Sequence, residues 1–80
     1  MDIKEIEEKV KDFLVDELEI EEDKIAPDAR LKEDLGVDSL EIVDVVVFVD
    51  QAFGFKMQPE DFKTLLTCQD FCAFIQQRLG

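Results

Sequence analysis

Histidine, tryptophan, tyrosine and asparagine are all absent from this chain of 80 residues. Because histidine is the commonest general base in enzymes, its absence argues strongly against triad catalysis. Zinc sites that combine cysteine with histidine are excluded for the same reason. A chain of this length also has little room for a substrate pocket together with catalytic groups. We therefore expect a protein that other proteins act upon, and not an enzyme.

Basic residues are scarce, with nine against 21 acidic residues and a net charge of −12. Nucleic-acid phosphates and anionic lipid headgroups require cations opposite them, so neither is expected as a partner. A basic protein surface is the natural complement of this charge. The hydrophobic fraction of 46% is too high for a disordered tail. We expect a single folded domain over residues 1–80.

Long hydrophobic runs are also missing. The longest unbroken apolar run, residues 45–49, is far too short to span a membrane. The first residues show no basic stretch followed by an apolar one, which a targeting signal would require. These features predict a cytoplasmic protein without membrane insertion.

Only two cysteines are present, Cys68 and Cys72, and in a helix they would share one face. A metal site would need further ligands close by, and none is evident. A disulfide framework would need more cysteines. We predict that both are reduced, buried side chains that behave as small apolar residues and bind no metal.

Helical periodicity marks the beginning of the chain, roughly residues 2–18. Its apolar residues recur at intervals of three or four, with charged residues between them. They are Ile3, Ile6, Val10, Phe13, Leu14 and Leu18. Residues 19–34 contain Pro27 and dense charges, and the spacing of their apolar residues is too irregular for a helix. We predict a long loop there, held on the core by Ile20, Ile25, Leu31 and Leu35.

The middle segment is locally ambiguous, because residues 45–49 have strong strand propensity. Its boundaries instead favour a helix over roughly residues 39–53. Asp38 and Glu41 have the spacing of a capping box, and Gly54 lies where a left-handed helix stop would fall. The residues of this helix that can face a core are Leu40, Val43, Val47 and Phe53. The residues that form a polar stripe are Glu41, Asp44 and Gln51.

Two helices are predicted in the last third of the chain. Pro59 fits the first turn of a short helix over residues 60–66. Thr67 then caps a final helix, with Asp70 three residues on. The apolar face of that helix consists of Phe71, Phe74, Ile75 and Leu79. The predicted fold is all-α: a four-helix bundle of three main helices and one short helix, with a long loop between the first two and no strands.

Ser39 is the only serine, and it lies at the predicted start of the middle helix. A helix start favours a phosphate through its free N–H groups and its dipole. Residues 33–41, Glu-Asp-Leu-Gly-Val-Asp-Ser-Leu-Glu, closely resemble the modification motif of acyl carrier proteins. The resemblance extends over nearly the whole chain, because the order of helices and loops is that of the family.

The resemblance implies that Ser39 receives 4'-phosphopantetheine from coenzyme A through a phosphodiester. A phosphopantetheinyl transferase would do this with magnesium, and Asp38 would help to position the metal and substrate of that enzyme. The thiol of the arm would hold acyl groups as thioesters for acyl-transferring and acyl-modifying enzymes of fatty-acid or related lipid or secondary-metabolite synthesis. The carrier itself, expected to be a monomer, would make and break no bonds.

Acidic residues dominate residues 33–55, which contain no basic residue. Enzymes with basic patches would be steered to this face, and binding should be transient and sensitive to salt. Leu40 and Val47, which can face a core, are also expected among the docking residues. The expected docking residues are Glu33, Asp34, Leu40, Glu41, Asp44, Val47, Phe48 and Gln51.

Phe48 departs from the family pattern, because it lies between Asp44 and Gln51 on the polar stripe. It is either an exposed apolar anchor for a specialised partner or a residue that packs inward and narrows the space for an acyl chain. Two other kinds of function stay open: a discrete polyketide, aminoacyl or peptidyl carrier, and an interaction subunit that keeps the carrier fold but is never loaded. No calcium-binding loop of the Asp-x-Asp-x-Asp-Gly type is present, which argues against a specific calcium site.

Overall fold

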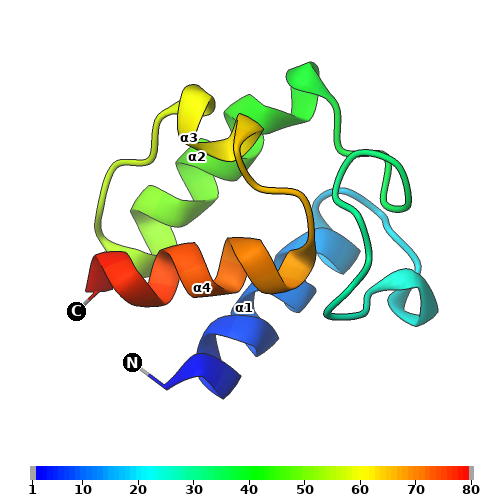
Figure 1. The fold of residues 1–80 in the computed structure, drawn as a ribbon, viewed down its shortest axis with the longest axis horizontal. Coiled ribbons are helices and arrows are strands. Elements are labelled where there is room, and N and C mark those ends of the chain that lie inside the picture. Colours follow the sequence, from blue (N-terminus) through cyan, green and yellow to red (C-terminus); the bar gives the residue numbers. More distant parts are fainter. Residues whose placement is uncertain (1, 80) are drawn as a thin grey trace.

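Four α-helices joined by loops make up the computed structural model, which describes residues 2–79 (Figure 1). The helices are α1 (Ile3–Asp16), α2 (Ser39–Phe53), α3 (Pro59–Lys63) and α4 (Cys68–Leu79). Residues 2–79 contain no β-strand, only an isolated bridge between Arg30 and Thr67. The predicted all-α fold of three longer helices and one short helix is confirmed. The short helix ends earlier than predicted, at Lys63.

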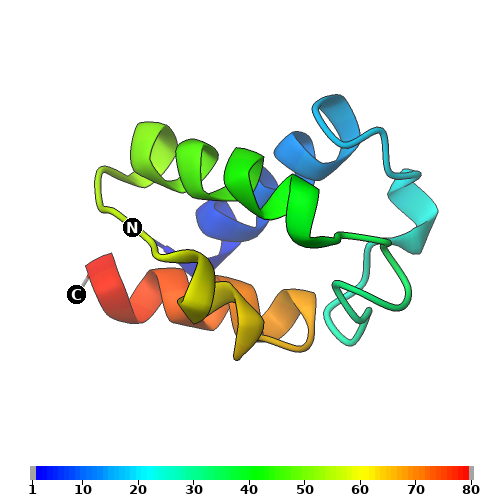
Figure 2. The same ribbon diagram turned by 90° about the horizontal axis from the view of Figure 1, so that it is seen from above.

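The helices pack in pairs, α1 against α4 and α2 against α3. The connection between α1 and α2 gathers at one end of the bundle, and α2 begins beside it (Figures 1 and 2). Within residues 2–79, no helix combines the length and the apolar character that crossing a membrane requires. The position of the connection between α1 and α2 brings the start of α2 close to the long loop.

The long loop is held on the core as predicted. Ile20, Leu31 and Leu35 are buried, and Ile25 is partly buried against them. The Leu31 N–H donates to the Leu66 carbonyl at 2.9 Å, which ties the loop to the connection between α3 and α4. A 3₁₀ helix, η1 (Glu22–Lys24), interrupts the loop. The sequence pattern did not reveal η1, because three residues are too few to show a period.

Helix boundaries follow from local capping. Of the capping box predicted between Asp38 and Glu41, only the bonds to the Asp38 side chain are formed within residues 2–79. Asp38 Oδ1 accepts hydrogen bonds from the N–H groups of Leu40 at 3.0 Å and Glu41 at 3.3 Å. Gly54 has a φ of 79°, a conformation that costs glycine little and so ends α2. The Thr67 hydroxyl accepts from the Asp70 N–H at 3.2 Å and fixes the start of α4. Capping chemistry therefore overrides the strand propensity of α2.

The rotation of α2 differs from the prediction. Leu40, Val43 and Val47 are 81%, 62% and 49% exposed, so the prediction that they face a core is wrong. Of the four predicted core residues only Phe53 is buried. The buried face of α2 consists of Ile42, Val45, Val49 and Phe53. Apolar residues occupy both faces of this helix, so the packing of the bundle selects the inner one, which periodicity could not do.

Candidate functional site

Ser39 is the first residue of α2, and its side chain is exposed. The turn before it is tied to the core. Gly36 has a φ of 72°, Val37 is 2% exposed, and the Val37 N–H donates to the Leu31 carbonyl at 2.9 Å. Within residues 2–79, the Ser39 hydroxyl makes no hydrogen bond. The site therefore presents an exposed alcohol that makes no hydrogen bond, next to a turn that is tied to the core.

A groove of about 470 Å³ lies beside Ser39. We call it the Ser39 groove. It runs between the loop before α2, the first turn of α2, and α3 with the residues that follow it. Its apolar lining consists of Leu31, Val37, Ile42, Phe62, Leu65 and Leu66. Its charged lining consists of Arg30, Lys32, Glu33, Asp38 and Lys63.

The chemistry of this site suits a group attached covalently through the hydroxyl. The alcohol is exposed and unbonded, the groove offers apolar surface next to it, and cations on the groove can offset an added negative charge. An arm joined to Ser39 by a phosphodiester fits these residues.

Asp38 combines two features at the site. Its Oδ1 caps α2, whereas its Oδ2 makes no hydrogen bond within residues 2–79. The side chain is also exposed. One oxygen of the carboxylate is therefore free for an external ligand while the other holds the helix start.

The predicted docking residues fall into two groups. Glu33 and Asp34 lie on the loop before α2, and both are engaged locally: Glu33 forms an ion pair with Arg30 at 3.0 Å, and Asp34 accepts from the Arg30 N–H at 2.9 Å. The other six lie on α2. They are Leu40, Glu41, Asp44, Val47, Phe48 and Gln51. Of these, Leu40, Asp44, Val47 and Gln51 are exposed, whereas Glu41 and Phe48 are partly buried.

Phe48 packs toward α1, which favours the second of its two interpretations. Its ring stacks on that of Phe13 with centroids 4.2 Å apart, and it meets the edge of Phe53 at 5.7 Å. Phe48 also lines a hollow between α1 and α2. The ring of Phe48 is therefore partly buried, which favours inward packing over an exposed anchor.

The pKa of Glu41 is raised by partial burial, and by the charges of Asp38 and Asp44. Desolvation and repulsion thus both oppose the charged form of this carboxyl. Such crowding destabilises the folded protein slightly and leaves negative charge available to a basic partner.

Sequence reasoning missed three features near Ser39. Val43 is exposed beside the docking candidates, and Leu66, 68% exposed, lines the Ser39 groove. Lys32 and Lys63 also line that groove, although they lie 31 residues apart in the sequence. Both lysines lie outside the acidic stretch 33–55, so its charge pattern gave no signal that they approach Ser39.

Cys68 and Cys72 are free and buried, as predicted. They line a second groove, of about 430 Å³, between α1, α4 and residues 25–27. Burial raises the pKa of Cys68 to about 11 and that of Cys72 to about 12. Within residues 2–79, no group of three or more potential ligands is placed to hold a metal ion.

We expect both thiols to react slowly with a thiol reagent at pH 7 in the folded protein, because the thiolate is the nucleophile and raised pKa values keep it scarce. Labelling should quicken as the pH approaches 11. Stopped-flow measurement with and without denaturant checks this, since unfolding should make both thiols fast. Rapid labelling of the native protein at pH 7 would contradict the burial of these thiols.

Comparisons with known proteins agree with this geometry. Residues 8–75 match the family model for the phosphopantetheine attachment site. The chain is 39% identical over 75 residues to an acyl carrier protein of Akkermansia muciniphila, covering 94% of each chain. It is 36% identical over 76 residues to one of Thermotoga maritima, covering 95% of this chain and 94% of the relative. A third, from Solidesulfovibrio magneticus, is 33% identical over 75 residues, covering 94% and 96%.

The matched segment includes Ser39, the loop before it and every helix that borders its groove. The prosthetic group of this family is 4'-phosphopantetheine, whose phosphate-linked arm fits the chemistry of the site. Its members are carriers and not enzymes. With a family match over most of its length and relatives aligned almost end to end, the chain belongs to the acyl carrier protein family.

Proposed function

We propose that Ser39 carries the 4'-phosphopantetheine arm, and that residues 1–80 act as one carrier domain that presents acyl groups as thioesters. The observation that carries this proposal is the exposed, unbonded hydroxyl of Ser39 at the start of α2, beside an apolar groove. The carrier contributes no chemistry of its own. Tethering raises the effective concentration of the acyl group at whichever enzyme is docked.

Asp38 is proposed to support the modification of Ser39. Asp38 is exposed and its Oδ2 makes no hydrogen bond within residues 2–79, so this oxygen can approach the magnesium ion of a phosphopantetheinyl transferase. Its Oδ1 keeps the first turn of α2 in place meanwhile. The residue next to the acceptor hydroxyl would thus serve both the helix and the transferase.

The test is to incubate the purified protein with a phosphopantetheinyl transferase, magnesium and coenzyme A. The intact mass should rise by one arm, and fragmentation should locate the added mass on Ser39. A protein that stays unmodified under conditions that load another acyl carrier protein would support instead an interaction subunit that is never loaded.

The exposed face of α2 is proposed to dock the transferase and enzymes of fatty-acid or related lipid or secondary-metabolite synthesis. Glu41 and Asp44 supply negative charge, while Leu40, Val43 and Val47 supply exposed apolar surface. A partner with Lys or Arg around an apolar patch complements this face. Because single exposed ion pairs contribute only about 0.2–1 kcal/mol, binding would be transient.

Replacing Glu41 with glutamine is expected to raise stability and lower partner affinity together. The pKa of Glu41 is raised in the folded protein. The protonated carboxyl therefore costs no folding stability below the pKa of the unfolded chain, and stability is lost as the pH rises through the folded-state pKa and the group ionises. The variant should therefore melt higher than the wild type at pH 7, and the gain should vanish below about pH 4. The KM of the transferase for the carrier should rise about two- to fivefold.

The matched control is Glu8→Gln, which makes the same charge change at an exposed position on α1. It should leave the KM almost unchanged. If the two variants raise the KM equally, net charge and not the α2 face governs docking.

A further inference from the structure

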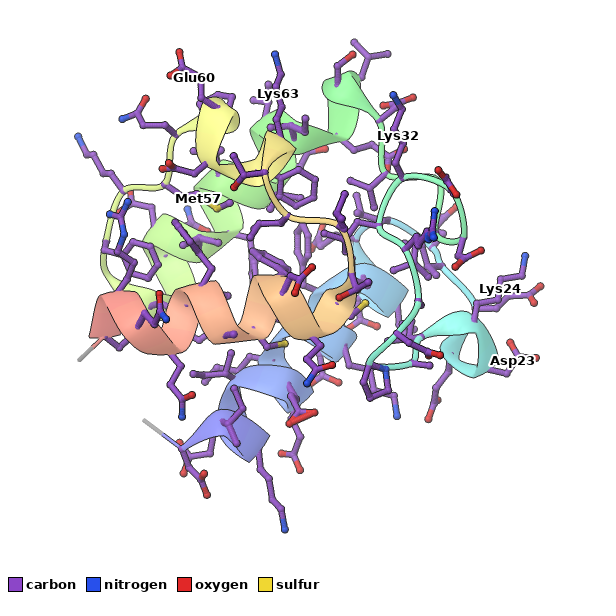
Figure 3. The ribbon with its side chains drawn as sticks, viewed as in Figure 1. Asp23, Lys24, Lys32, Met57, Glu60 and Lys63 are labelled. Atoms are coloured by element: carbon purple, nitrogen blue, oxygen red, sulfur yellow. The ribbon has the colours of Figure 1, made fainter. Side chains whose placement is uncertain are left out.

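Three of the nine basic residues of this acidic chain, Arg30, Lys32 and Lys63, line the Ser39 groove. They come from separate parts of the chain: Arg30 and Lys32 from the long loop, and Lys63 from the last position of α3. Figure 3 shows Lys32 and Lys63 on either side of the start of α2. Three cations thus line the groove beside Ser39, together with Glu33 and Asp38, within a protein of net charge −12.

The three cations differ in their availability. The Arg30 guanidinium pairs with Glu33, with Nη1 and Oε2 3.0 Å apart, so its charge is already neutralised. Within residues 2–79, Lys32 and Lys63 make no ion pair. Both are exposed, and a lysine stem is long and flexible enough to swing over a groove that its own residue lines. Two ammonium groups are therefore free to meet an anion there.

An arm on Ser39 would bring such an anion. Its phosphodiester is bonded to the Ser39 oxygen, so the negative charge must lie at the mouth of the groove. Asp38 and Glu41 already place negative charge at this helix start. A further charge would be repelled there unless cations offset it.

We propose that Lys32 and Lys63 bind the phosphodiester of the arm and direct the arm over the Ser39 groove. This inference rests on the proposed attachment at Ser39. Each lysine offsets part of the repulsion from Asp38 and Glu41 and holds the first part of the arm against the protein. Because both ammonium groups are exposed, the contact is weak and sensitive to salt, and a docked enzyme can replace it.

The experiment compares Lys32→Gln/Lys63→Gln with Lys9→Gln/Lys56→Gln. The control pair loses the same charge at exposed positions that do not line the groove. Each protein is prepared with and without the arm, and the difference in Tm between the two forms is measured at low salt. In the groove variant this difference should fall about 2–5 °C below the wild-type value, whereas in the control it should not change. At about 0.5 M salt the effect should largely disappear.

A second measurement follows the phosphate itself. The transverse relaxation rate of the ³¹P resonance in the loaded protein should be lower in the groove variant than in the control, because a released phosphodiester moves faster. Equal relaxation rates and equal Tm differences in the two variants would overturn the proposal. Intact mass distinguishes this failure from failure of the proposed function, since the arm is then present and only its contact with the lysines is missing.

The bound anion could be the phosphodiester of the arm or a carboxylate on its cargo, and the two are distinguished by changing the acyl group on the arm. The arm is loaded once with a neutral butyryl group and once with a succinyl group, which ends in a carboxylate. Replacing the two lysines should change the Tm difference and the ³¹P relaxation by the same amount in both acylated forms. Dependence that appears only with the succinyl group would overturn the assignment to the phosphodiester and place the bound anion on the cargo. A lysine effect on the KM of the transferase alone, with no effect on the arm, would likewise overturn it.

Discussion

Replacing Ser39 with alanine is expected to abolish addition of the phosphopantetheine arm and to leave the fold intact. The hydroxyl makes no hydrogen bond within residues 2–79, and alanine is a good helix former, so the start of α2 should survive the change. The other two hydroxyl side chains are already engaged. The Thr64 hydroxyl donates to the Asp61 carbonyl at 2.7 Å, and the Thr67 hydroxyl accepts from the Asp70 N–H at 3.2 Å.

Intact mass after incubation with the transferase and coenzyme A measures the loss, and circular dichroism confirms that the variant is folded. Thr64→Ala is the matched control, since it removes a hydroxyl elsewhere and should load normally. An alanine variant of Ser39 that still gains one arm would show that the attachment site lies at another residue.

Replacing Phe48 with alanine is expected to lower the free energy of unfolding by about 2–4 kcal/mol. The ring stacks on Phe13 and meets Phe53 edge to face, so its loss removes contacts between α1 and α2. The expected loss is smaller than the range of about 3–5 kcal/mol for a fully buried phenylalanine, because the side chain is only partly buried. Denaturant unfolding measures the change, and partner affinity should be almost unchanged in the folded variant.

Val47→Ala tests the neighbouring position, where we expect the opposite pattern of effects on stability and partner affinity. Val47 is 49% exposed, so its truncation should change stability little and reduce affinity for a docked enzyme. If Phe48→Ala instead weakened partner binding by about 2 kcal/mol with unchanged stability, Phe48 would be an interface anchor after all. Such a result would contradict the inward packing of the ring.

The ends of the helices could be read from the sequence because capping is local chemistry. Asp38 satisfies two N–H groups within three residues of itself, and Gly54 adopts a φ that most residues avoid. Thr67 and Asp70 cap α4 in the same way. These short-range bonds placed Ser39 at the first position of α2, although the residues that follow favour a strand. The attachment motif is local too, so it could be recognised without the fold.

The rotation of α2 and the composition of the Ser39 groove depend on contacts between distant segments. Apolar residues cover both faces of α2, so only packing against the other helices buries Val45 and Val49 and leaves Leu40 exposed. The same packing turns Phe48 toward Phe13 on α1. Lys32 and Lys63 line the same groove because the loop before α2 is hydrogen-bonded to the connection after α3. The spacing of residues along the chain does not predict such contacts between distant segments, since they form only when the segments fold against one another.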